Sequence, residues 1–204
     1  MAGERAAEEL APGLWRWTAR HPAWRPRADP GSPGDWDPNV GCVLCVEARS
    51  ALFFDPLLPA NADAFWQWCD GVVGSRCVHV LTTIRFHGRS REAVAGRYGG
   101  EVVRSLRSLP HGVEALRFTA ADETMFWLPA HGALVPGDRL IGDDAGGVRL
   151  CPDSWLAYLR APLDQTGLCT LLRPLLDLPV QRVLVSHGEP LLTGGAAALE
   201  RILA

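Results

Sequence analysis

Short apolar runs separated by turn residues dominate the chain and predict many strands. The first is Leu14 to Thr18, a hairpin is expected over 41–47 and 51–55, and Cys77 to Thr82 is expected to be a buried strand. Further strands are predicted near 101–104, 113–118, 124–128, 133–135, 139–142 and 182–186. Runs of this length, bounded by glycine, proline and polar residues, are typical of packed sheets.

Helices are predicted where apolar residues recur at helical spacing behind a capping residue. Asn61 is expected to cap a helix that reaches about Val73, and Ser90 a second helix that stops at the glycines 99–100. Later helices are predicted over 153–159 and 167–176 and behind Thr193.

The order of these elements predicts an α+β fold, a four-layer αββα sandwich of two mixed sheets between helices. A single doubly wound sheet is the alternative. Against it, no G-x-G-x-x-G follows the first strand, and the middle third of the chain is a strand meander. At 204 residues the chain is expected to form one domain, 1–204.

One segment without strand or helix patterning, residues 19–39, is rich in proline and contains Trp24 and Trp36. Long loops of this kind in compact domains are usually functional or disordered. We expect a flap that lays one or both tryptophans over a cleft; the alternative is that the tryptophans only pin the loop down.

Composition and charge exclude several classes of function. The net charge is −3 and the pI about 6.1, and no basic stripe is evident, so we expect no nucleic-acid partner. All 20 basic residues are arginine, which excludes chemistry that needs a lysine. The first residues are charged and lack the apolar core of a signal peptide, and no run is apolar over roughly 18 residues. A cytoplasmic protein without a membrane partner is therefore expected.

The cysteines and isolated histidines suggest ordinary structural roles. Cys42 and Cys45 form a CxxC, but within a strand positions three apart face opposite ways, and no second CxxC completes a zinc site. Buried thiols in a reducing compartment are expected. Four histidines have no spacing that suggests ligation: His21, His79, His111 and His131.

Four segments, in order, resemble the metallo-β-lactamase superfamily across nearly the whole chain. They are VLCVEARSALFFDPL at 43–57, VLTTIRFHGRS at 80–90, FWLPAHGALVPGDRL at 126–140 and RVLVSHGEP at 182–190. In that family the second segment carries His-x-His-x-Asp-His, which supplies ligands to two metal ions. The resemblance implies the αββα fold and, where the ligands survive, a metallo-hydrolase.

Most of the metal ligands that the resemblance implies are replaced in this chain. Thr83 and Arg85 stand at the first two histidine positions, His87 at the aspartate and Gly88 at the last histidine. Counting back from the later Gly-Asp places Thr119 at a third histidine position. Because a guanidinium has no lone pair to donate, the first metal is expected to be absent.

Two of the family's ligand positions are retained, Asp138 and His187. With His87 they make a plausible site for at most one divalent ion, zinc or iron. The alternative is a metal-free site in which Arg85 places its charge where the first metal would lie and pairs with Asp138.

Two functions follow from these alternatives. The first is a degenerate, non-hydrolytic protein that binds a small anionic ligand in the residual cleft, using Arg85, Trp24 and Trp36. The second is a single-metal hydrolase of a small ester, thioester or amide, with Asp138 and His187 as candidate catalytic residues beside His87. An interaction module that kept only the scaffold is a third possibility. The acidic pair at 122–123 suggests an acid/base pair or, as is more usual, a solvated turn.

Overall fold

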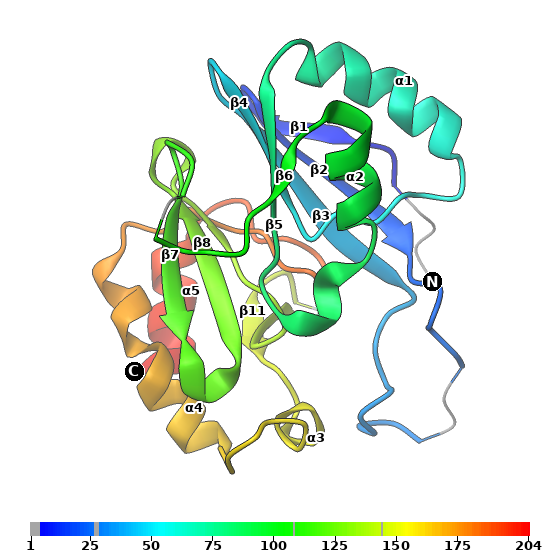
Figure 1. The fold of residues 1–204 in the computed structure, drawn as a ribbon. Coiled ribbons are helices and arrows are strands. Elements are labelled where there is room, and N and C mark those ends of the chain that lie inside the picture. The colour runs from blue at the N-terminus through cyan, green and yellow to red at the C-terminus, as the bar shows by residue number, and fades with distance from the viewer. Residues whose placement is uncertain (1–4, 27–28, 108, 144) are drawn as a thin grey trace.

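Two large sheets and a short hairpin make up the β-structure (Figure 1). The structure is a computed structural model and describes residues 5–26, 29–107, 109–143 and 145–204. The first sheet contains β1 (Glu8–Ala11), β2 (Leu14–Arg20), β3 (Asn39–Val46), β4 (Ser50–Phe54), β5 (Cys77–Leu81) and β6 (Glu101–Val102), in that order. The second contains β12 (Arg182–Val183), β9 (Ala133–Val135), β8 (Glu123–Leu128) and β7 (Glu114–Phe118). The hairpin pairs β10 (Leu140–Gly142) with β11 (Val148–Leu150).

Helices cover the outer faces of both sheets (Figure 1). On the first sheet lie α1 (Ala62–Val73) and α2 (Arg91–Tyr98). On the second lie α3 (Asp153–Leu156), α4 (Gln165–Leu172) and α5 (Gly195–Leu203). Four short 3-10 turns connect these elements: η1 (Arg85–Gly88), η2 (Thr119–Ala121), η3 (Pro129–His131) and η4 (Arg173–Asp177).

The alternation of side chains along β3 shows why the first sheet is buried on both faces. Cys42 and Leu44 pack against the helical layer, together with Phe65 of α1. Val43 and Cys45 point the other way, into the layer between the two sheets. Successive strand residues face opposite sides, so one apolar strand supplies two cores.

The second sheet repeats this arrangement with the opposite helices. Phe126 and Leu128 of β8 enter the core between the sheets. Met125 and Trp127 face outward and join the core that α4 and α5 close. Three hydrophobic cores therefore separate four layers. The predicted αββα sandwich is confirmed, and the doubly wound alternative is wrong.

Several boundaries differ from the sequence prediction. Strands β1 and β11 were not predicted, and the strand expected over 182–186 is regular only at Arg182–Val183.

The Asn61 side chain caps α1 as expected. Ser90 stands before α2, but its hydroxyl accepts a hydrogen bond from the Leu58 backbone and does not cap the helix. The helix from Asp153 ends early, at Leu156. Gly194, not Thr193, precedes α5.

Among the described residues, no helix is both long and apolar enough to cross a membrane.

Candidate functional site

The candidate site lies at one end of the sandwich, where loops from both sheets meet. The backbone of Gly41 in β3 donates to the carbonyl of Ser186, and the Gly142 backbone donates to the carbonyl of His187. These bonds tie the loop after β12 to the first sheet and to β10. A cavity of about 400 Å³ opens here. Its lining includes His21, Trp36, Phe86, His87, Arg89, Asp138, Arg139, Trp155, Tyr158 and His187.

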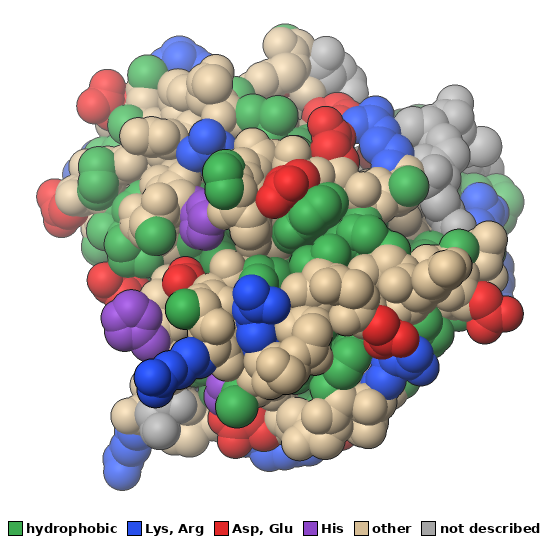
Figure 2. Space-filling model, turned by 90° about the horizontal axis from the view of Figure 1, so that it is seen from above, with side chains coloured by type: hydrophobic (Ala, Val, Ile, Leu, Met, Phe, Trp, Pro, Cys, Tyr) green, Lys and Arg blue, Asp and Glu red, His purple; other side chains and the backbone are tan. Residues whose placement is uncertain are grey.

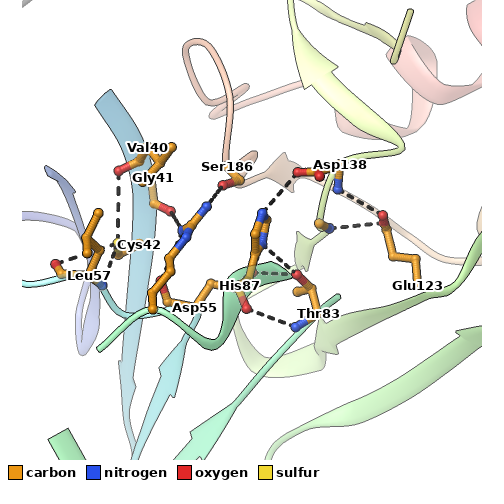
Figure 3. Close-up of polar contacts among 12 residues, drawn as sticks. Val40, Gly41, Cys42, Asp55, Leu57, Thr83, His87, Glu123, Asp138 and Ser186 are labelled. Carbon is orange, nitrogen blue, oxygen red and sulfur yellow. Dashed lines mark hydrogen bonds and ion pairs between the residues drawn. The ribbon is translucent and has the colours of Figure 1, made fainter. Parts of the chain in front are cut away.

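Asp55, directly after β4, supports the floor of the site. It is 3 % exposed and its backbone has a φ of 48°. Its carboxylate accepts hydrogen bonds from the Thr83 amide at 2.9 Å and from the Thr83 hydroxyl. The other partner is Nδ1 of His87, 2.8 Å from Oδ2 (Figure 3). Asp55 therefore fixes the ring of His87 and leaves its Nε2 directed toward the cavity.

His87 lies between two carboxylates. Its Nε2 is 3.0 Å from Oδ1 of Asp138, opposite the Asp55 contact (Figure 3). Burial and the nearby Arg89 lower the pKa of His87, but the charges of Asp138 and Asp55 outweigh them and raise it above its usual value. The imidazole is thus placed either to hold a proton or to share its Nε2 lone pair with a cation.

Asp138 is aimed into the site by a buried glutamate. The Glu123 carboxylate accepts hydrogen bonds from the backbone amides of Gly137, Asp138 and Arg139, at 2.8–3.0 Å. Burial raises the pKa of Glu123 to about 7, although Arg139 opposes the shift. A side chain at Gly137 would place its Cβ 2.8 Å from the Thr83 hydroxyl, so this turn requires glycine. The solvated turn expected for the 122–123 pair is wrong for Glu123, which is 1 % exposed.

His187 completes the group from the far end of the chain. Its Nε2 lies 3.4 Å from Oδ1 of Asp138. Burial lowers the pKa of His187, with His87 and Arg89 adding to the effect against Asp138, so the ring is held neutral. The two histidines lower the pKa of Asp138 well below its usual value despite burial. A neutral imidazole and an ionised carboxylate are the forms that bind metal ions.

The three side chains converge on one point. One potential ligand atom from each of His87, Asp138 and His187 lies within 4.8 Å of the others. Although Asp138 Oδ1 is close to both rings, its angles are not those of a hydrogen bond. Among the described residues, this buried oxygen and Nδ1 of His187 have no hydrogen-bond partner. Buried polar atoms without a protein partner usually contact an ion or a water molecule.

Arg85 does not pair with Asp138, and the sequence prediction of that ion pair is wrong. Its side chain is 48 % exposed, and its Nε lies 3.6 Å from Asp122. The guanidinium also contacts the ring of Phe86 and the carbonyl of Tyr158. The physical reason is that η1 begins at Arg85 and turns this side chain outward. His87, two residues later in the same turn, is the residue that is buried.

Arg89 is a half-buried cation beside the site, and sequence reasoning missed it. Its guanidinium donates to the carbonyls of Asp55 and Gly41 and, at 2.8 Å, to the Ser186 hydroxyl. It therefore links η1 to both sheets at the edge of the cavity. A lone arginine after a glycine gave no signal in the sequence, because its partners are backbone carbonyls distant along the chain.

The positions aligned with the first metal provide no ligand. Thr83 is engaged with Asp55. Thr119 is exposed on η2 and is not among the residues that line the cavity. The absence of the first metal stays a prediction.

The loop over 21–38 supplies part of the cavity wall. Trp36 lies edge-on to His187, with ring centroids 5.6 Å apart, and Trp155 meets the same ring at 5.1 Å. Trp24 does not line this cavity, but it lines an adjoining one with Trp36, Trp155 and His187. Its Nε1 donates to the carbonyl of Trp36. Residues 27–28 of the predicted flap lie outside the described part of the chain.

His21 is a second residue that the sequence did not single out. Its ring lies 5.1 Å from that of Trp36, and it lines the cavity. Burial lowers the pKa of His21 to about 4, and the positive groups Arg89 and His87 add to the shift. Only its place in the proline-rich loop, beside the predicted flap tryptophans, could have pointed to it.

Comparison with known proteins identifies the fold. No family model matches the chain, and no curated protein matches its sequence. Among solved structures, the chain is similar to the DIM-1 metallo-β-lactamase, with a TM-score of 0.60, 13% identity and coverage of 98% of each chain. It is also similar to a metallo-β-lactamase from Erythrobacter litoralis, with a TM-score of 0.61, 16% identity and coverage of 98% of this chain and 91% of that one. The chain therefore has the metallo-β-lactamase fold.

Proposed function

We propose that this protein is a hydrolase that uses one divalent metal ion, zinc or iron, held by His87, Asp138 and His187. The observation that carries the proposal is the convergence of three ligand atoms within 4.8 Å around a buried carboxylate oxygen. Arg85, whose charge would have opposed an ion, lies outside this group. Two imidazoles and one carboxylate form a ligand set that leaves open positions for water and substrate.

The side chains behind these ligands fit a metal centre. Asp55 accepts from Nδ1 of His87, which is the usual support of a metal-binding histidine. Glu123 orients Asp138 through the backbone. A divalent ion held by His87, Asp138 and His187 would activate a water molecule and polarise a carbonyl oxygen. The side chains of the site bind and orient the substrate and exclude water from around its reacting group.

The walls of the cavity favour a small, partly apolar acyl compound, an ester, thioester or amide. Trp36 and Trp155 flank His187. Phe86 and Tyr158 also line the cavity, and each is more than half exposed. Aromatic walls with a few convergent polar groups are typical of small-molecule sites. A cytoplasmic location is part of the proposal, since all six cysteines are free thiols, as expected in a reducing compartment.

A second candidate function, metal-free binding of a small anion, has one specific observation in its favour. His87 contacts Asp55 on one side and Asp138 on the other. A protonated ring would lie between the two carboxylates and balance one of their two negative charges without an ion. Arg89 and Arg139 then make the cavity attractive to an anionic ligand. In this form the protein would be non-hydrolytic.

Chelation and reconstitution separate the two functions. The purified protein is assayed with a panel of small aryl esters, thioesters and amides before chelation, after it, and after zinc or iron is restored. We expect hydrolysis that disappears on chelation, returns with metal, and falls at least about 100-fold in Asp138→Ala. Hydrolysis that is insensitive to chelation and to Asp138→Ala would contradict the proposal. Absence of hydrolysis together with anion-dependent thermal stabilisation would favour the second candidate.

A further inference from the structure

A second group of metal-binding side chains lies at the opposite end of the sandwich. Cys45, Glu47 and His131 each offer a ligand atom, and these atoms lie within 4.8 Å of one another. The candidate active site contains no cysteine among its three ligand residues, so the two groups are chemically distinct.

The three residues come from different elements and from both sheets. Cys45 is in β3 and points into the core between the sheets. Glu47 follows β3, in the turn where its amide donates to the Ser50 carbonyl. His131 belongs to η3, which joins β8 to β9 in the second sheet. Figure 2 views the molecule from the top of Figure 1, which is this end of the sandwich; histidine side chains reach the surface there beside acidic and basic ones.

The distance between two atoms of the group is close to the distance between two ligands of one zinc ion. Cys45 Sγ lies 3.9 Å from Oε1 of Glu47. Two ligands about 2.3 Å (sulfur) and 2.0 Å (oxygen) from a tetrahedral zinc ion are separated by roughly 3.5 Å. The His131 ring makes no hydrogen bond with any described residue, while its carbonyl is held by Arg182 at 2.7 Å. Binding of one ion requires the three atoms, now within 4.8 Å of one another, to approach to roughly 3.5 Å.

The surroundings position the group and leave it accessible. The backbone of Glu47 is fixed by the Arg76 guanidinium, which donates to its carbonyl at 2.7 Å. Gly112 packs against the Glu47 carboxylate so closely that an added Cβ would lie 2.8 Å from Oε1. Cys45 is buried, whereas Glu47 and His131 are half-buried and meet solvent. An ion can therefore reach the group from outside.

We propose that Cys45, Glu47 and His131 form a zinc site, distinct from the candidate active site, that links the two sheets. Thiolate, imidazole and carboxylate together are a ligand set typical of zinc, and the fourth position is open to solvent. On binding, the Cys45 thiol gives its proton to solvent and the sulfur donates to the ion. Because one ligand comes from the second sheet, a bound ion stabilises the packing of the sandwich.

Cobalt substitution tests this site separately from the proposed activity. Co²⁺ is titrated into full-length Asp138→Ala protein, in which the candidate active site is disabled. A cobalt–thiolate charge-transfer band is expected to saturate near one equivalent, and zinc is expected to displace it and raise Tm. The band is expected to be lost in the Asp138→Ala/Cys45→Ser double variant and retained with Cys77→Ser, which changes an exposed thiol as a control.

The half-buried ligand provides a variant that does not depend on changing the core. His131→Ala in the same background is expected to raise the Kd for Co²⁺ at least about 100-fold. His79→Ala, which changes a β5 histidine outside the group, is expected to leave it unchanged. A folded protein that gives no thiolate band would overturn the proposal. So would a band that survives Cys45→Ser, or cobalt affinity that is unaffected by His131→Ala.

Discussion

At the scale of single residues, Arg89 and not Arg85 places its positive charge beside the cavity. Arg85 aligns with a lost metal ligand, but its charge is balanced at the surface by Asp122. Arg89 carried no signal, yet its guanidinium holds three oxygens of both sheets beside the cavity. Alignment with the family's motif predicts where the backbone of a residue lies. The direction of its side chain depends on the local turn.

The difference between the two arginines predicts their effects on stability. Arg89→Ala removes three hydrogen bonds of a charged group and is expected to lower the free energy of unfolding by about 2–4 kcal/mol. Arg85→Ala, the matched control, is expected to change it by no more than about 0.5 kcal/mol, because exposed ion pairs contribute little. Urea denaturation of both variants measures this. Equal midpoints for the two would contradict the assigned roles.

At the scale of elements, the sequence predicted regular strands and helices better than the loops that form the site. Alternation in 42–45 and the Asn61 cap are local properties, and both appear in the structure. The position of Glu123 is not local, since its carboxylate is satisfied by backbone amides at 137–139. His21 likewise becomes part of the cavity only because the loop over 21–38 folds back onto His187.

This loop predicts a pH dependence of stability. Burial lowers the pKa of His21 from its usual 6.5 to about 4. Between these pH values His21 is protonated in the unfolded chain but not in the folded protein. The free energy of unfolding therefore falls as the pH falls from about 6.5 to 4. His21→Gln is expected to lose less stability over this interval. Urea midpoints of wild type and variant at several pH values test this, and parallel curves would contradict it.

At the scale of the whole molecule, the fold was predictable because its signals are distributed along the chain. The order of the strands and helices and four family-like segments together predicted the αββα arrangement. The two groups of ligand residues differ in this respect. His87, Asp138 and His187 were found through aligned positions, whereas Cys45 and His131 are far apart in sequence and carry no motif. Only folding brings their side chains together.

Metal stoichiometry tests the central claim, that His87, Asp138 and His187 hold one ion. Wild type, Asp138→Ala and His187→Ala are purified without chelator, equilibrated with zinc, freed of excess and analysed by plasma emission. Circular dichroism confirms that each is folded. We expect each variant to retain one equivalent of zinc less than wild type, whatever is bound at the opposite end of the sandwich. Equal zinc content in all three proteins would contradict the account.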